Sequence, residues 1–174
     1  MFRFWGQASG SAADAAVSPD VEINTLDSGK SESNTTVYTT GTFQPAGNSL
    51  VLLAVASKSV SSGDNVVPTV TGNGLTWVEV DNEIPQANYT RLTVFRAMGS
   101  SPTSGQATIT FSATQDSILW DIQEFANVDT SGTNGSGAIV QTVSNTATAT
   151  SVTVTLAAFG ATDNATYGAF SRKN

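Results

Sequence analysis

The loop DTSGTNGSG (129–137) holds the oxygen-bearing side chains whose spacing comes nearest to a metal site. Asp129, Ser131 and Thr133 alternate along it, as the first oxygen ligands do in a calcium-binding loop. The bidentate glutamate that closes such a loop has no counterpart here. The pattern therefore favours a structural turn, and we expect no bound metal and no cofactor.

Paired carboxylates could hydrolyse a glycosidic bond, which requires two acids about 5 to 10 Å apart across a cleft. The acids of this chain instead gather in the N-terminal segment and near predicted turns, where solvation is the ordinary role of an acid. They include Asp14, Asp20, Glu22, Asp27, Glu32, Asp64, Asp81, Glu83, Asp116, Asp129 and Asp163. Because the chain contains no histidine and no cysteine, the commonest general base, thiolate ligands and disulfides are excluded. We expect a protein that is not an enzyme.

The charge balance excludes two classes of partner. The chain has 14 acidic and 7 basic residues, a net charge of −7, and no cluster of Lys and Arg that could neutralise phosphates. No apolar run approaches the roughly 20 residues that span a bilayer. We therefore expect neither a nucleic acid nor a membrane as partner.

Exposed aromatic side chains would indicate a sugar-binding surface, because such rings stack on pyranoses. Trp120 lies between Ile118 and Ile122 by strand alternation, which predicts a core position. Trp77 is undecided by the same criterion, and Tyr89 stands near a predicted strand start. Trp77 and Tyr89 are therefore the candidate ligand-binding residues.

The first residues, MFRFWGQASGSAADAAVSPD, combine an aromatic tip with a small and polar continuation. Phe2, Phe4 and Trp5 predict an anchor for a partner protein on an N-terminal arm (1–19), and the alternative is a disordered tail. A secretory signal needs roughly 7–15 apolar residues after a basic start, and Gly, Gln and Ser stand there instead. We expect no such signal, and the alternative is a fragment whose signal was removed.

Residues 20–174 read as one domain made of short strands. Apolar and polar residues alternate between turn signals such as Asn73-Gly74 and Asn134-Gly135, which favour positive φ. In GQATITF, for example, Ala107, Ile109 and Phe111 share one face. The predicted strands are 21–26, 36–43, 49–57, 66–71, 75–80, 89–98, 106–112, 117–126, 138–144, 150–158 and 165–170. This pattern predicts an all-β fold, an antiparallel β-sandwich of jelly-roll type.

Two strands depart from simple alternation. SLVLLAVA (49–56) is apolar on both faces, which predicts a central strand covered on one side by core and on the other by a loop or a neighbouring subunit. In SILWDIQEF, strict alternation would bury Glu124 and expose Phe125. A bulge near Gln123 would reverse both positions, and a buried functional acid is the alternative.

WDIQEFANVDTSG (120–132) resembles a β-sandwich domain found in tailed-phage structural proteins and bacterial surface proteins. Glu124, Phe125, Val128 and Asp129 match that family's pattern, and Asn127 replaces its usual glycine. The resemblance extends over most of residues 45–170. Such domains continue for further strands beyond a stretch like NATYGAF (164–170), so we expect this edge to be covered by another chain. The cover would come from the 20–43 region or the arm of an adjacent subunit. The alternative is that the strand order already places 165–170 in the middle of a sheet, so that no edge is left open.

These features together predict a virion structural protein, made in the host cytoplasm and exposed by lysis. The specific expectation is a capsid decoration or cement protein, or a head fibre, of a tailed phage, with the major capsid protein or another virion protein as partner. A homo-oligomer is expected, and capsid symmetry favours a trimer by analogy. The alternative is a carbohydrate-binding or adhesion module of a phage fibre or bacterial surface protein, extracellular or on the cell surface, with a glycan as ligand.

Overall fold

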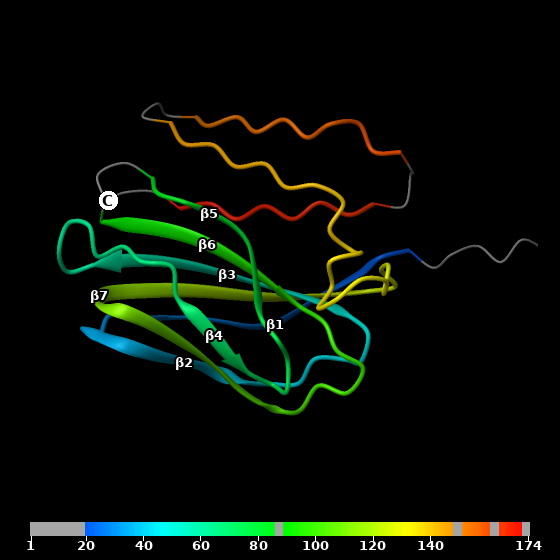
Figure 1. The fold of residues 1–174 in the computed structure, drawn as a ribbon, viewed down its shortest axis with the longest axis horizontal. Coiled ribbons are helices and arrows are strands. Elements are labelled where there is room, and N and C mark those ends of the chain that lie inside the picture. Colours follow the sequence, from blue (N-terminus) through cyan, green and yellow to red (C-terminus); the bar gives the residue numbers. More distant parts are fainter. Residues whose placement is uncertain (1–19, 86–88, 148–150, 161–163, 172–174) are drawn as a thin grey trace, which may run out of the picture.

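The computed structural model describes residues 20–85, 89–147, 151–160 and 164–171, so the arm and its predicted anchor Phe2, Phe4 and Trp5 lie outside the described residues. Within them every regular element is a β-strand and every strand pair is antiparallel (Figure 1). The prediction of an all-β, antiparallel fold is confirmed.

The strands form one hydrogen-bonded sheet in the order β1-β7-β3-β6-β5, and β2 and β4 pair with β7 off this path. The strands predicted at 106–112 and 117–126 are a single long strand, β7. The bounds are β1 (Glu22–Ser31), β2 (Thr35–Phe43), β3 (Leu50–Ser59), β4 (Thr69–Gly72), β5 (Val78–Glu83), β6 (Thr90–Ala97) and β7 (Gly105–Ala126).

Strand β7 belongs to two parts of the sheet because it bends sharply between its halves (Figure 1). Its first half pairs with β2 and β4, and its second half pairs with β1 and β3. Gln115 is fully buried at the bend, and its side-chain amide donates to the carbonyls of Asp64 and Ala113, both at 2.9 Å. Fixing this bend brings the apolar sides of the two halves together.

The inner core lies between these two parts of the sheet. Its largest fully buried side chains include Leu53 on β3 and three residues of β7, namely Ile109, Ile118 and Ile122. Burial of one such side chain contributes about 1.5–3 kcal/mol. The remaining buried members come from β2, β3, β4, β6 and β7: Tyr38, Phe43, Val51, Val55, Val70, Phe95, Ala107 and Phe111.

The predicted bulge near Gln123 is wrong. Strand β7 pairs with β3 without a register shift from Ser117 to Phe125, and the irregularity lies in β1 between Thr25 and Asp27. Glu124 and Phe125 are both buried because they point to opposite faces of a sheet that is covered on both sides. The carboxylate of Glu124 accepts a hydrogen bond from the backbone amide of Ala46 at 2.5 Å, which gives this acid a structural role.

The chain after β7 has no strand among its described residues, so the strands predicted at 138–144, 150–158 and 165–170 are wrong there. In Figure 1 the yellow, orange and red segments run extended along one side of the sheet. Alternation of apolar and polar residues specifies the two faces of an extended segment. It does not supply the neighbouring strand with which the backbone N–H and C=O groups must pair to form a sheet. The sandwich and jelly-roll descriptions remain predictions.

Candidate functional site

The sheet has a second apolar face, here called the outer face, which points away from the inner core. It arises because β3 is apolar at both alternating sets of positions. Leu92 and Val94 on β6 and Leu119 and Phe125 on β7 point to the same side as Leu50 and Leu52. Leu50, Leu52 and Phe125 are buried on this face and form a separate small core. The structure confirms that 49–56 forms a central strand, since β3 pairs with β6 and with β7. It also confirms that both faces of this strand are covered, because residues of β3 belong to the inner core and to the outer-face core.

The cover of the outer face is the C-terminal layer, defined as residues 138–147, 151–160 and 164–171. One attachment is Tyr167, whose ring meets that of Phe125 edge to face at a centroid distance of 6.1 Å. Ala138 and Ile139 also pack against the outer-face core. The stretch TYGAF is therefore not an exposed edge strand, and residues 22–43 pair with β7 of their own chain rather than covering it.

Side-chain amides hold two segments of the C-terminal layer side by side. Gln141 donates to the carbonyl of Ala157 at 3.0 Å and accepts from its amide at 2.9 Å. Asn145 donates to the carbonyl of Thr153 at 2.9 Å. Asn145 lies four residues after Gln141, and its partner Thr153 lies four residues before Ala157. Both bridges therefore fit one antiparallel register. The segments are aligned as a hairpin would be, although side chains rather than backbone groups join them.

A cavity of about 1280 Å³, the outer cavity, separates the C-terminal layer from the sheet. Apolar side chains of both walls line it. Those of the sheet and its ends include Val21, Leu50, Leu52, Val80, Leu92, Val94 and Phe125, and those of the layer include Val143, Val152, Val154, Leu156, Phe159 and Tyr167. Half of the large apolar side chains that are exposed among the described residues lie in the layer: Val140, Val143, Val152, Val154, Leu156 and Phe170. The outer face is therefore incompletely covered.

The burial of the Tyr167 side chain shows that this part of the C-terminal layer lies against the sheet. Burial raises the pKa of its phenol to about 12, and the charge and hydrogen bond of the Asp121 carboxylate add to this shift. Asp121 stands on β7 on the same face as Phe125. This end of the layer is docked against the sheet, in contrast to the exposed segment 151–158.

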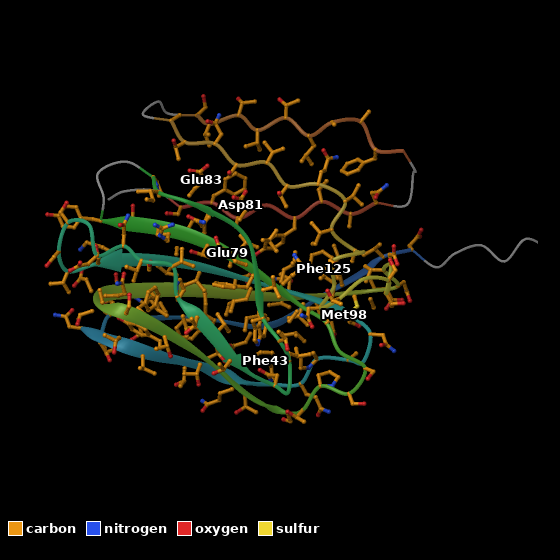
Figure 2. All side chains as sticks on the ribbon, viewed as in Figure 1. Phe43, Glu79, Asp81, Glu83, Met98 and Phe125 are labelled. Atoms are coloured by element: carbon orange, nitrogen blue, oxygen red, sulfur yellow. The ribbon has the colours of Figure 1, made fainter. Side chains whose placement is uncertain are left out.

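The edge strand β5 bounds the outer cavity with negative charge. Its acids Glu79, Asp81 and Glu83 follow one another at alternate positions (Figure 2), and the last two also line the cavity. The side chain of Asn82 joins the carboxylate of Glu79 to the guanidinium of Arg91. Charges along an edge oppose pairing with another strand. The C-terminal layer, by contrast, has no charged residue between 138 and 160.

The two candidate ligand-binding aromatics lie in different environments. Trp77 packs against the inner core, and its indole N–H is buried without a hydrogen-bond partner among the described residues. Tyr89 is 41% exposed, and its backbone carbonyl accepts from the amide of Ser59 at 2.7 Å. The ring contacts among the described residues involve neither of them. Of the two candidates, the structure thus leaves only Tyr89 exposed, and the glycan site stays a prediction.

Trp120, predicted to be core, is half-buried against the inner core. Its indole N–H donates to the carboxylate of Asp27 at 2.7 Å, and the same carboxylate accepts from the amide of Gly41 at 2.9 Å. The ring covers Gly29 so closely that a Cβ there would stand 2.4 Å from it. These contacts fasten β1 and β2 to β7 and leave the indole with a structural role.

The loop at 129–137 folds as a turn. The carboxylate of Asp129 accepts from the amide of Ser131 at 2.7 Å, and this bond lowers the pKa of the carboxyl. Asn134 and Gly135 have φ of 51° and 82°, as the Asn-Gly signal predicts. Across the described ranges no three acidic side chains gather as a metal site would need. No helix in the same ranges is long and apolar enough to cross a membrane.

Comparison of the chain with protein-family models, with curated proteins and with solved structures finds no match in any of the three. Function is therefore inferred from the surfaces that the described residues form. The outer cavity was not foreseen from the sequence, although one signal pointed to it: an apolar strand at 49–56 that required cover on its second face.

Proposed function

We propose that this chain is a non-enzymatic structural protein that acts by assembling with other protein chains. The specific form of the proposal is a virion protein that decorates or cements a tailed-phage capsid, or forms a head fibre. A single observation carries it: the apolar outer face is covered by segments that have no backbone ladder and that expose their own valines, Leu156 and Phe170. Large exposed apolar patches mark interaction surfaces.

Two further features support this form of the proposal. The stretch WDIQEFANVDTSG resembles domains of tailed-phage structural proteins, and the net charge of −7 suits a protein exposed at high copy number on a particle surface. A sugar-binding function would need several exposed rings on one surface, whereas Trp77 is packed into the inner core. Assembly with protein is the function that we therefore adopt.

The test compares two valines of similar exposure on different surfaces. Val154 in the C-terminal layer is 44% exposed and Val37 on β2 is 47% exposed, so lysine at either position should leave the protein folded. Val154→Lys should abolish self-association in sedimentation velocity and co-sedimentation with capsids of the phage that encodes the chain. Val37→Lys should retain both. Equal binding by the two variants would overturn the proposal.

A further inference from the structure

We propose that the outer cavity receives the aromatic tip of the N-terminal arm, residues 1–5, of a second copy of this chain. This inference rests on the proposed function and deepens it, because it names both the partner and the place where the partner binds. Four observations carry it: the point at which the arm leaves the domain, the length of its spacer, the area of its aromatic side chains and its charge.

The arm leaves the domain beside the cavity. Val21 lines the outer cavity and packs against the outer-face core. The carbonyl of Asp20 accepts a hydrogen bond from the side-chain amide of Asn127 at 3.0 Å. The chain is therefore fixed next to the apolar space, and two copies that pack with these ends together would each present an arm to the cavity of the other.

The spacer is longer than a tip that binds within its own domain would need. Residues 6–20 are almost all small or polar and separate Trp5 from Val21, which already stands in the cavity wall. Fully extended, these residues span about 50 Å. A domain of this size has a radius of gyration of about 15 Å. The reach of the arm therefore matches a neighbouring copy better than a cavity that begins where the arm itself begins.

The aromatic area is sufficient for a stable pair. Phe2, Phe4 and Trp5 can bury about 150–250 Å² each. Two exchanged arms would thus bury about 900–1500 Å² on the arm side alone, and stable interfaces bury about 1200–2000 Å² in total. A cavity lined by valines, leucines and Phe125 offers these rings the apolar surroundings that they require.

The charges of the two surfaces are complementary. Arg3 stands between Phe2 and Phe4, and it is the only charged side chain among the first thirteen residues. Asp81 and Glu83 on β5 line the cavity. A guanidinium on the arm would meet two carboxylates there, which favours this cavity over an uncharged apolar surface.

The absence of cysteine from the chain permits a direct test by cross-linking. Phe4→Cys and Val154→Cys are made as separate full-length proteins, mixed in equal amounts and oxidised, and the mixed disulfide is identified by mass spectrometry. The control pairs Phe4→Cys with Val37→Cys, which has similar exposure on β2. We expect at least about tenfold more mixed disulfide with Val154→Cys, because docking raises the local concentration of the two thiols.

Two results would overturn the inference. One is a yield with Val154→Cys no greater than that with Val37→Cys. The other is a double variant, Phe4→Cys with Val154→Cys in one chain, that forms only the disulfide within a chain. Capsid binding is measured separately, so that cross-linking without capsid binding would refute the proposed virion function and leave the exchange of arms standing. Capsid binding without cross-linking would do the reverse.

Discussion

Two stretches of this chain have the same alternation of apolar and hydroxyl side chains but different structures. In 106–111, Ala107, Ile109 and Phe111 are buried, and the backbone pairs with β2 on one side and β4 on the other. In 151–156, Val152, Val154 and Leu156 are exposed, and no backbone ladder forms. The difference lies in the partners that the rest of the chain supplies to each stretch.

This difference divides the molecule into a self-sufficient part and an incomplete one. The inner core is closed on both sides by hydrogen-bonded strands of the same chain. The C-terminal layer relies on side-chain amides at Gln141 and Asn145 and on the docking of Tyr167. Unpaired extended backbone is a surface on which another strand can add. The incomplete part is therefore where assembly is expected.

Truncating one residue in each stretch gives the largest expected contrast. Ile109→Ala removes a fully buried side chain and should lower the free energy of unfolding by about 2–5 kcal/mol. Val154→Ala should change it by less than about 0.5 kcal/mol, because Val154 is exposed in the isolated chain. Chemical denaturation of both variants measures the contrast. Similar losses would show that the C-terminal layer is packed as tightly as the inner core.

Asn73 offers a second test of the stretch 106–111, because its side chain contacts the backbone where β7 begins. Its buried side-chain amide donates to the carbonyls of Phe43, Thr103 and Gly105, and its φ is 57°. Asn73→Gly preserves the positive φ and removes the three bonds, so we expect a loss of about 1–3 kcal/mol in the free energy of unfolding. A loss below about 0.5 kcal/mol would mean that the amide does not hold the ends of β2 and β7 together.

The phenol of Tyr167 tests whether the C-terminal layer docks on the sheet. Its folded pKa of about 12 lies above the ordinary pKa of a tyrosine, about 10, so its contribution to stability is present below pH 10 and is lost as the pH rises through 12. The difference in alkaline absorbance titration between the wild type and Tyr167→Phe should therefore show a transition well above pH 10. A transition at the ordinary value would indicate an undocked layer.

The smallest expected effect concerns the amide bridge between the two segments of the layer. Gln141→Ala removes both hydrogen bonds to the backbone of Ala157, which is exposed. We expect the free energy of unfolding to change by less than about 0.5 kcal/mol, because water replaces the lost bonds. Chemical denaturation measures it, with Asn145→Ala as the matched variant. A loss above about 1 kcal/mol in the free energy of unfolding would show that these hydrogen bonds are broken in the same cooperative transition as the sheet.

The strands of the inner core were predictable because local signals agree with one another there. Alternation placed Ile109 and Phe111 on one face, and the Asn73-Gly74 signal placed a turn of positive φ before β5. The bend in β7 was not predictable, since it depends on a buried amide, Gln115, that contacts a carbonyl 51 residues away. Glu124 was misjudged because cover on both faces removes the reason for a bulge.

The candidate site was predictable in outline. The two-faced apolar stretch 49–56 required a second cover, and the structure places the C-terminal layer there. Its lack of a ladder could not be predicted, because the alternation in Val152, Val154 and Leu156 is the same whether or not a partner strand exists. Trp77 looked like a candidate for sugar stacking, and its place against the inner core depends on contacts distant in sequence.

The most direct test of this division is amide hydrogen exchange of the isolated protein, followed by exchange of its assembled form. Amides of β3 and of β7 should exchange only through global unfolding, whereas those of 140–147 and 151–158 should exchange with little protection. Assembly should slow exchange in these two segments and leave the inner strands unchanged. Protection of the two segments equal to that of β3 in the isolated protein would contradict the account, because the C-terminal layer would then already be complete.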